Sequence, residues 1–166
     1  SFALAIIALI GFVTVMGVHQ LLTGSRQADD QQYAVAQVQY AEHYITTDVL
    51  MTWKISSAGF PLQLYWEAED ADGDELSYQV VYTLVGSEGN SRRLQRDLLV
   101  KDIATGVTLE DSTLTAANDI HADSSCTYAA STLTVTLKAL ASGSTGDAIE
   151  TRVFQVTPRK TDVEVI

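Results

Sequence analysis

Apolar residues are concentrated at the start of the chain. From Phe2 to Val18 the only polar side chain is Thr14, and no charged residue precedes Arg26. A helix in the core of a small soluble domain would have one polar face, and this segment has none. The run is slightly shorter than the ~20 apolar residues that cross a bilayer, and Leu22 lies near its end. Residues 1–24 are therefore predicted to be an apolar helix that lies in a membrane or in a bundle of identical helices.

After residue 24 the pattern changes but remains helical. Residues 27–53 contain no Gly or Pro, and small and aliphatic residues recur at spacings of four, three, four and four, as on one face of a helix. These residues are Ala34, Val38, Ala41, Ile45 and Val49. The helix is expected to end near Gly59, because glycine often terminates helices and Pro61 cannot continue one. Residues 25–58 are thus predicted to be an amphipathic continuation, which gives a rod of roughly 80 Å.

The remainder of the chain, residues 59–166, is predicted to be a β-rich head. β-Branched and aromatic residues gather in five segments, which are predicted to be strands. These strands are 62–68, 76–85, 93–100, 132–138 and 151–156. Residues 70–74 form an acidic turn between the first two strands, whereas residues 105–131 show no clear pattern. The predicted fold class is α+β, with a long N-terminal helix packed against a C-terminal antiparallel sheet.

Charge and cysteine content exclude several classes of function. The chain has 10 Lys+Arg and 21 Asp+Glu, a net charge of -11, and 8 of the basic and 17 of the acidic residues lie in residues 56–166. This balance argues against a nucleic-acid partner, because binding to phosphate needs a basic surface. The single cysteine, Cys126, has no partner for an intramolecular disulfide, and no Cys/His spacing fits zinc or haem.

This layout resembles the type IV pilin family of prepilin-type proteins. The resemblance rests on the apolar helix, its amphipathic continuation and the C-terminal sheet, and on the stretch Val18-His19-Gln20-Leu21-Leu22-Thr23-Gly24 before a polar helix. It covers the whole chain as architecture, but only residues 1–55 in sequence character. It implies a non-enzymatic structural subunit of an extracellular filament. Such a subunit is inserted in the cytoplasmic membrane by its N-terminal helix. The pilus assembly machinery then builds it into a helical filament of identical subunits, with a methylated N-terminus and a role in cell adhesion.

The resemblance also assigns the filament core to the apolar helix. The expected self-assembly residues are Phe2, Leu4, Ile6, Ile7, Leu9, Ile10, Phe12, Val13, Val15, Met16, Val18, Leu21 and Leu22. One feature departs from the family, in which a glutamate typically occupies the fifth mature position. Here that residue is Ala5, and the first acid is Asp29. Either the mature chain begins upstream of Ser1, which we favour, or the subunit belongs to the class that lacks this glutamate.

Two further functions remain open from the sequence. One is a pseudopilin of a type II secretion system, whose short assembly acts as a piston. The other is a membrane-anchored extracellular binding module that stays monomeric; a tethered enzyme is the least supported. Small residues favour a polymer over the binding module, because Ala3, Ala8 and Gly11 allow helices to approach closely.

The acidic turn is the sharpest candidate for a metal site. Asp70, Asp72 and Asp74 alternate around Gly73, a pattern that suits Ca²⁺ and resembles the calcium-binding turns of cadherin-like domains. An EF-hand would need a glutamate at its twelfth position, which is Val81 when counted from Asp70. A solvated hairpin turn is therefore the preferred interpretation, and calcium is the only cofactor that the sequence suggests.

Three smaller patterns complete the analysis. Tyr33, Tyr40 and Tyr44 form a stripe that is expected to contact the sheet or a neighbouring subunit. The basic residues around Arg96 are candidates for pairing with acidic turns of a neighbouring subunit. Glycine weakens helices, so a local interruption over Gly17–Gly24 is considered for the assembled state, with a continuous helix as the alternative.

Overall fold

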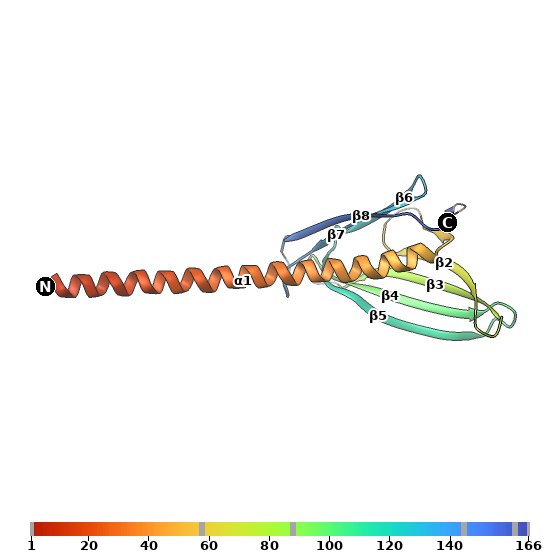
Figure 1. Ribbon diagram of the computed structural model, residues 1–166, viewed down its shortest axis with the longest axis horizontal. Coiled ribbons are helices and arrows are strands. Elements are labelled where there is room, and N and C mark those ends of the chain that lie inside the picture. Colours follow the sequence, from red (N-terminus) through yellow and green to blue (C-terminus); the bar gives the residue numbers. More distant parts are fainter. Residues whose placement is uncertain (1, 57–58, 87–88, 144–145, 161–162, 166) are drawn as a thin grey trace.

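The computed structural model of the chain describes residues 2–56, 59–86, 89–143, 146–160 and 163–165. In the helix, the side chains of residues 2–15, 17, 18 and 21 lie outside this description. The molecule consists of one long helix and a head of β-strands, and the C-terminal half of the helix is embedded in the head (Figure 1). The observed class is α+β.

Helix α1 runs without interruption from Phe2 to Met51. Its 50 residues correspond to about 75 Å at ~1.5 Å per residue. Its N-terminal half extends away from the strands (Figure 1). The helix ends at Met51, whereas the sequence predicted a helix to residue 58, so the predicted C-terminal end is wrong. The backbone N–H of Trp53 donates to the carbonyl oxygen of Tyr65 at 3.0 Å, so the chain leaves the helix to pair with the sheet.

Within the described residues, the head contains one sheet of nine strands. Their bounds are β1 Lys54–Ile55, β2 Leu62–Glu69, β3 Glu75–Val85, β4 Ser91–Asp102, β5 Thr108–His121, β6 Ser125–Ala129, β7 Thr132–Ala139, β8 Glu150–Val156 and β9 Glu164–Val165. The order across the sheet is β6-β7-β5-β4-β3-β2-β1-β9, and β8 pairs with β7. The predicted antiparallel sheet is correct except for β1 and β9, which run parallel.

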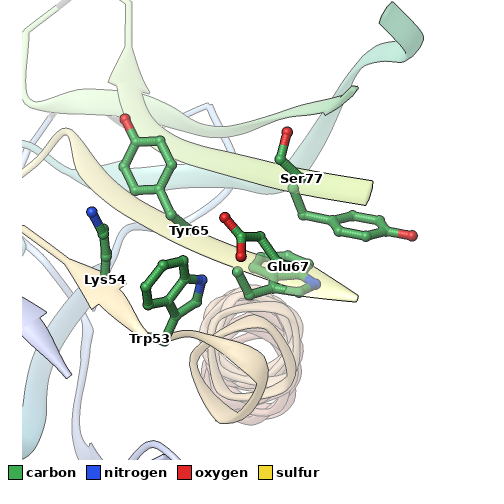
Figure 2. Close-up of a pocket in the computed structure, with 7 residues that line it drawn as sticks. Trp53, Lys54, Tyr65, Glu67 and Ser77 are labelled. Carbon is green, nitrogen blue, oxygen red and sulfur yellow. The ribbon is translucent and has the colours of Figure 1, made fainter. Parts of the chain in front are cut away.

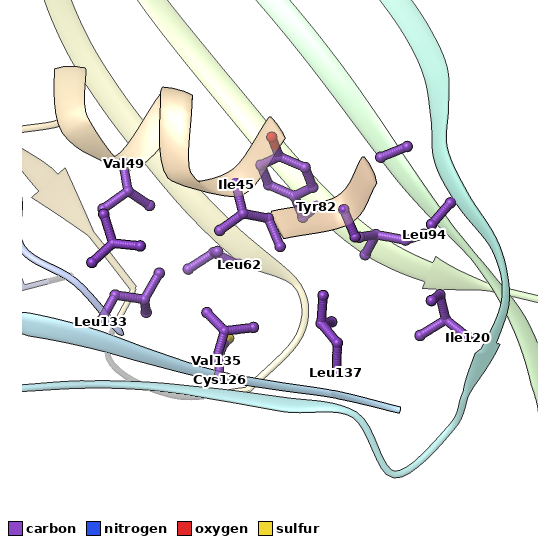
Figure 3. Close-up of a cluster of buried hydrophobic side chains, with 14 of the residues drawn as sticks. Ile45, Val49, Leu62, Tyr82, Leu94, Ile120, Cys126, Leu133, Val135 and Leu137 are labelled. Atoms are coloured by element: carbon purple, nitrogen blue, oxygen red, sulfur yellow. The ribbon is translucent and has the colours of Figure 1, made fainter. Parts of the chain in front are cut away.

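The sheet curls around the C-terminal half of α1. Strands β5 and β7 are paired in the described residues through Ile120 and Ala139 alone, so β1–β5 with β9 form one limb and β6–β8 form the other. Helix α1 passes between the limbs (Figure 1). Each limb directs fully buried side chains at the helix, including Leu62 and Tyr82 from one limb and Leu133 from the other (Figure 3).

The buried face of the helix is the one that the sequence predicts. All five residues of the stripe are fully buried in one cluster with the strand side chains. They are Ala34, Val38, Ala41, Ile45 and Val49. Burying one aliphatic side chain stabilises a fold by roughly 1.5–3 kcal/mol, so this stripe is a large part of what holds helix and sheet together.

The five predicted strands are all present, as β2, β3, β4, β7 and β8, with ends within two residues of those predicted. Strand β7 also shows the predicted alternation of buried and half-buried side chains. Four strands were not predicted: the two-residue strands β1 and β9, and the longer β5 and β6, which occupy most of residues 105–131. The side chains of β5 from Thr108 to Thr113 are all exposed, so the sequence there has no buried alternation to reveal a strand.

Candidate functional site

The N-terminal half of α1 is the first candidate functional element, and we call residues 2–29 the free half. Of its described side chains, those at positions 16, 19 and 20 and from 22 to 29 are exposed. Met16 and Leu22, exposed at 53% and 58%, are the predicted core residues that the structure describes. The other predicted core residues have side chains outside the described part. They are Phe2, Leu4, Ile6, Ile7, Leu9, Ile10, Phe12, Val13, Val15, Val18 and Leu21.

The described part of the chain leaves the membrane prediction open. Among the residues with described side chains, no helix is long and apolar enough to span a bilayer. Most of the predicted apolar helix, residues 1–24, lies outside those residues. The backbone of α1 is continuous through Gly17–Gly24 in the single chain, whereas the interruption was considered for the assembled state and stays a prediction.

A buried ionic joint fastens the C-terminal half of α1 to strands β3 and β4. The Asp48 carboxylate on the helix accepts hydrogen bonds from both sides of the Arg96 guanidinium, Nε to Oδ2 at 2.7 Å and the terminal nitrogen to Oδ1 at 2.9 Å. The Tyr82 hydroxyl donates to the same Oδ2 at 2.5 Å. The side chains of Asp48 and Arg96 are only 9% and 12% exposed, so little solvent screens the pair. We call Asp48, Tyr82 and Arg96 the ionic joint.

The electrostatics of the ionic joint favour its charged form. Burial raises the pKa of the Tyr82 hydroxyl far above its usual range, and the neighbouring Asp48 charge adds to the effect. The Asp48 carboxylate, by accepting hydrogen bonds, raises the pKa of Arg96. Tyr82 therefore remains a neutral donor and Arg96 a cation. Two-point Arg–carboxylate contacts fix orientation as well as distance, so the ionic joint sets the angle and register of helix against sheet.

The C-terminal half of α1, residues 30–51, is called the embedded half. Its partly exposed side chains make further polar contacts to β5 and to β8. The Tyr33 hydroxyl donates to Asp119 Oδ2 at 2.8 Å. Closer to the C-terminal end of the helix, Glu42 forms an ion pair with Arg152 on β8. Gln31 Nε2 also donates to a carboxylate oxygen of Glu150, on the same strand, at 2.7 Å. Polar contacts therefore begin close to the level at which the buried stripe begins.

These contacts bear on two interpretations made from the sequence, the tyrosine stripe and the pairing of Arg96. Of the tyrosine stripe, Tyr33 contacts the sheet as expected, whereas Tyr40 and Tyr44 are 60% and 37% exposed within the single chain. Contact of those two with a neighbouring subunit stays a prediction. The assignment of Arg96 to a neighbouring subunit is wrong, because Asp48 of the same chain occupies it.

The acidic turn forms the predicted hairpin connection between β2 and β3. Oδ1 of Asp70 accepts hydrogen bonds from the backbone N–H groups of Asp72 and Asp74, at 2.9 and 3.0 Å. The turn is exposed, and Gly73 has the positive φ of 88° that such a turn requires. Among the described residues, no three His, Cys, Asp or Glu side chains are arranged to hold a metal ion. Calcium binding by Asp70, Asp72 and Asp74 stays a prediction, and the geometry is that of a self-satisfied solvated turn.

Cys126 lies in the core, as expected for a small apolar residue. It is 3% exposed, and its thiol contacts the Gly59 carbonyl oxygen at 2.9 Å. Burial raises the pKa of the thiol to about 12, so the nucleophilic thiolate is scarce at neutral pH. The position therefore offers no reactive group.

The residue that sequence reasoning missed is Asp48. It lies beside Val49 and three residues after Ile45, which places a carboxylate on the edge of the buried helix face. A carboxylate at such a position needs a buried cation, and this signal could have identified its partner as one of the few basic residues of the head. Comparison of the chain with protein-family models, with curated proteins and with solved structures finds no match.

Proposed function

We propose that this chain is a structural subunit of an extracellular filament of the type IV pilus kind, and that it polymerises through the free half of α1. In this proposal the helix is inserted in the cytoplasmic membrane before assembly. The heads of identical subunits then surround a bundle of their N-terminal helices. The chain has no enzymatic role in this proposal.

The observation that carries the proposal is the contrast within α1. The embedded half has a fully buried stripe, whereas the free half extends beyond the head with exposed described side chains. No charged residue precedes Arg26. The head does not cover the described side chains of the free half, so in this proposal lipid or other copies of the chain cover its apolar segment. A segment that moves from lipid to a helix bundle is covered by apolar groups both before and after assembly.

The ionic joint supports a mechanical part of the same proposal. A subunit in a filament passes tension from its helix to its head. The buried stripe resists separation of helix and sheet, and the two-point contact between Asp48 and Arg96 resists sliding along the helix axis. Because both limbs grip the helix, tension is shared over the strands of the curled sheet.

A charge placed in the free half tests the proposal directly. Ile10→Glu puts a carboxylate into the predicted filament core, where its desolvation opposes bundling. Gln32→Glu adds the same charge at an exposed position of the same helix and is the matched control. After detergent removal, the wild-type chain and Gln32→Glu are expected to form sedimentable fibres with a regular helical repeat by electron microscopy, and Ile10→Glu is expected to remain dispersed.

The outcomes separate the functions left open by the sequence. Long fibres that depend on residue 10 support the pilin assignment. Assemblies that remain short under all conditions support the pseudopilin. A wild-type chain that forms no ordered assembly, but inserts as a monomer into lipid vesicles, contradicts the proposal and supports a membrane-anchored binding module.

A further inference from the structure

The curled sheet contains two long strands that are paired on one side only. Within the described residues, β5 from Thr108 to Thr115 pairs with β4 and with no second strand, and β8 pairs with β7 alone. These two open edges belong to different limbs and lie on opposite sides of α1 (Figure 1). An unpaired strand edge presents a row of free backbone N–H and C=O groups, which makes it a template for another strand.

The remaining edges of the sheet are short or covered. At β6, the backbone N–H of Gly59 donates to the carbonyl oxygen of Cys126 at 2.7 Å. At β1, the two-residue strand β9 pairs with the edge, and the Lys54 ammonium forms an ion pair with Glu164 at 2.8 Å. The same ammonium lies 5.1 Å from the centre of the Trp53 ring (Figure 2). In the described part of the chain, β5 and β8 are therefore the long strands with an open edge.

Side chains along both open edges are exposed to solvent. On β5, every residue from Thr108 to Thr113 is exposed, and Leu109 among them is exposed at 56%. On β8, Val153 is exposed at 61%. A strand that pairs with either edge covers part of these apolar side chains, so pairing removes apolar area from water in addition to satisfying backbone groups.

The two strands run in opposite directions relative to α1. Strand β5 ends where the helix enters the head, because Asp119 near its end accepts the hydrogen bond of the Tyr33 hydroxyl. Strand β8 begins at the same level, where Glu150 accepts a hydrogen bond from Gln31. When the helices of two copies are parallel, β5 of one copy and β8 of the other are therefore antiparallel. An antiparallel ladder is slightly more stable per residue than a parallel one.

Charge favours pairing of β5 with β8 over pairing of β5 with itself. Glu110 and Asp111 are exposed near the start of β5, and like charges that face each other across two strands destabilise a sheet. Arg159 is exposed just beyond the end of β8, and within the described residues it forms no ion pair. In the antiparallel arrangement the end of β8 lies beside the start of β5, so Arg159 comes close to the two acids.

We propose that neighbouring copies of this chain are joined edge to edge, with β5 of one head paired antiparallel to β8 of the next. The inference rests on the proposed filament, because it needs subunits whose helices are parallel. The contact is heterologous, since it uses two different surfaces, and such contacts build open filaments when the rotation between copies does not close a ring. Each head has one edge of each kind on opposite sides of α1, so it binds two neighbours at once.

Hydrogen exchange of the full 166-residue chain tests the proposal. Exchange is measured by mass spectrometry, peptide by peptide, for the chain dispersed in detergent and for sedimented fibres. Segments 108–115 and 150–156 are both expected to exchange roughly tenfold more slowly in fibres, because amides directed away from β4 and β7 gain hydrogen-bond partners. The acidic turn, residues 70–74, is exposed in the single chain and is the internal control, with exchange expected to be unchanged.

The outcomes separate this inference from the proposed function. Fibres in which both segments exchange as they do in detergent overturn the inference and leave the proposed filament intact. Slower exchange in only one of the two segments also overturns it, because that edge would then have a different partner. A chain that forms no fibres contradicts the proposed function, and the inference with it.

A charge swap identifies the two strands that meet. Arg159→Glu is expected to raise the critical concentration for fibre formation about fivefold, because it repels the acids of the neighbouring β5. Arg93→Glu makes the same change at an exposed position of β4, which is paired on both sides, and is expected to have no effect. Adding Asp111→Arg to Arg159→Glu is expected to restore assembly, which a purely structural role of Arg159 would not allow. An Arg159→Glu chain that assembles like the wild type, or a double variant without rescue, overturns the pairing.

Discussion

The two halves of α1 belong to one continuous helix and have opposite surroundings. In the embedded half, every fourth or third residue is fully buried between two limbs of a sheet. In the free half, the described side chains are exposed. In proteins, most of the stability of a helix comes from tertiary packing of its apolar face. The embedded half obtains that packing from its own head, and in the proposed filament the free half obtains it from lipid or from neighbouring helices.

Polar contacts sharpen the difference between the halves. The embedded half carries a buried carboxylate, Asp48, which is satisfied by Arg96 and Tyr82. Residues 2–25 of the free half carry no charge that would have to be desolvated in lipid or in a bundle of helices, and its charged residues, Arg26 and Asp29, lie at its C-terminal end. In the proposed filament, the embedded half keeps a fixed partner within its own chain, whereas the free half exchanges lipid for neighbouring helices.

Deleting residues 1–24 is expected to have the largest effect on the difference between the two halves. The remaining chain keeps the whole buried stripe and the ionic joint, because both begin beyond the deletion. We expect a soluble monomer that retains the sheet and a cooperative unfolding transition, with no sedimentable fibres. Analytical ultracentrifugation and circular dichroism measure both properties. Fibres formed by this fragment would contradict the proposal that the chain assembles through the free half.

Breaking the ionic joint is expected to have the next largest effect. Asp48→Asn leaves the Arg96 guanidinium buried without a counter-ion, and loss of one partner of a buried pair costs about 3–5 kcal/mol. Urea denaturation of the fragment 25–166 measures the change in the free energy of unfolding. The double variant Asp48→Leu, Arg96→Met removes both charges and is the control, which is expected to recover most of the stability. Equal losses in the single and double variants would show that the charge pair is not the cause.

Truncating one aliphatic side chain in each half is expected to change the free energy of unfolding by very different amounts. Ile45→Ala removes a fully buried side chain and is expected to lower the free energy of unfolding by about 2–5 kcal/mol. Leu22→Ala, at a side chain 58% exposed in the single chain, is expected to leave that energy nearly unchanged and to weaken assembly instead. Urea denaturation and the critical concentration for fibre formation measure the two effects. A loss of head stability in Leu22→Ala would mean that the free half contacts the head.

The sequence predicted the parts of the fold in which burial follows a simple period. The stripe from Ala34 to Val49 repeats with the period of a helix, and β7 repeats with the period of a strand, so both were identified correctly. The end of α1 was placed too late, because a two-residue pairing of β1 with β2 ends the helix and no glycine or proline marks that point. Strand β5 was missed because its first half is exposed and paired on one side only, to β4.

The candidate site was predictable only in part, for a related reason. Composition alone indicates an apolar free half. In the ionic joint, the register of β3 and β4 sets Tyr82 opposite Arg96, and the packing of α1 on these strands brings Asp48, 34 and 48 positions away in the sequence, to both. The stacking of Trp66 on Tyr78 likewise needs the register that sets these two residues opposite each other. Pairings of this kind depend on topology, which local patterns do not carry.

The smallest expected effect lies at a partly exposed ion pair of the embedded half. Arg152 on β8 pairs with Glu42 on α1, and the two side chains are 43% and 26% exposed. Solvent and salt screen such a pair, so Arg152→Ala is expected to lower the free energy of unfolding by about 0–1 kcal/mol, far less than Asp48→Asn. Raising the salt concentration should shrink this difference further, while leaving the effect of Asp48→Asn largely intact because that pair is buried. Urea denaturation at low and high salt measures both. A loss for Arg152→Ala that equals the loss for Asp48→Asn would mean that this partly exposed pair, and not the buried joint, fastens the helix to the head.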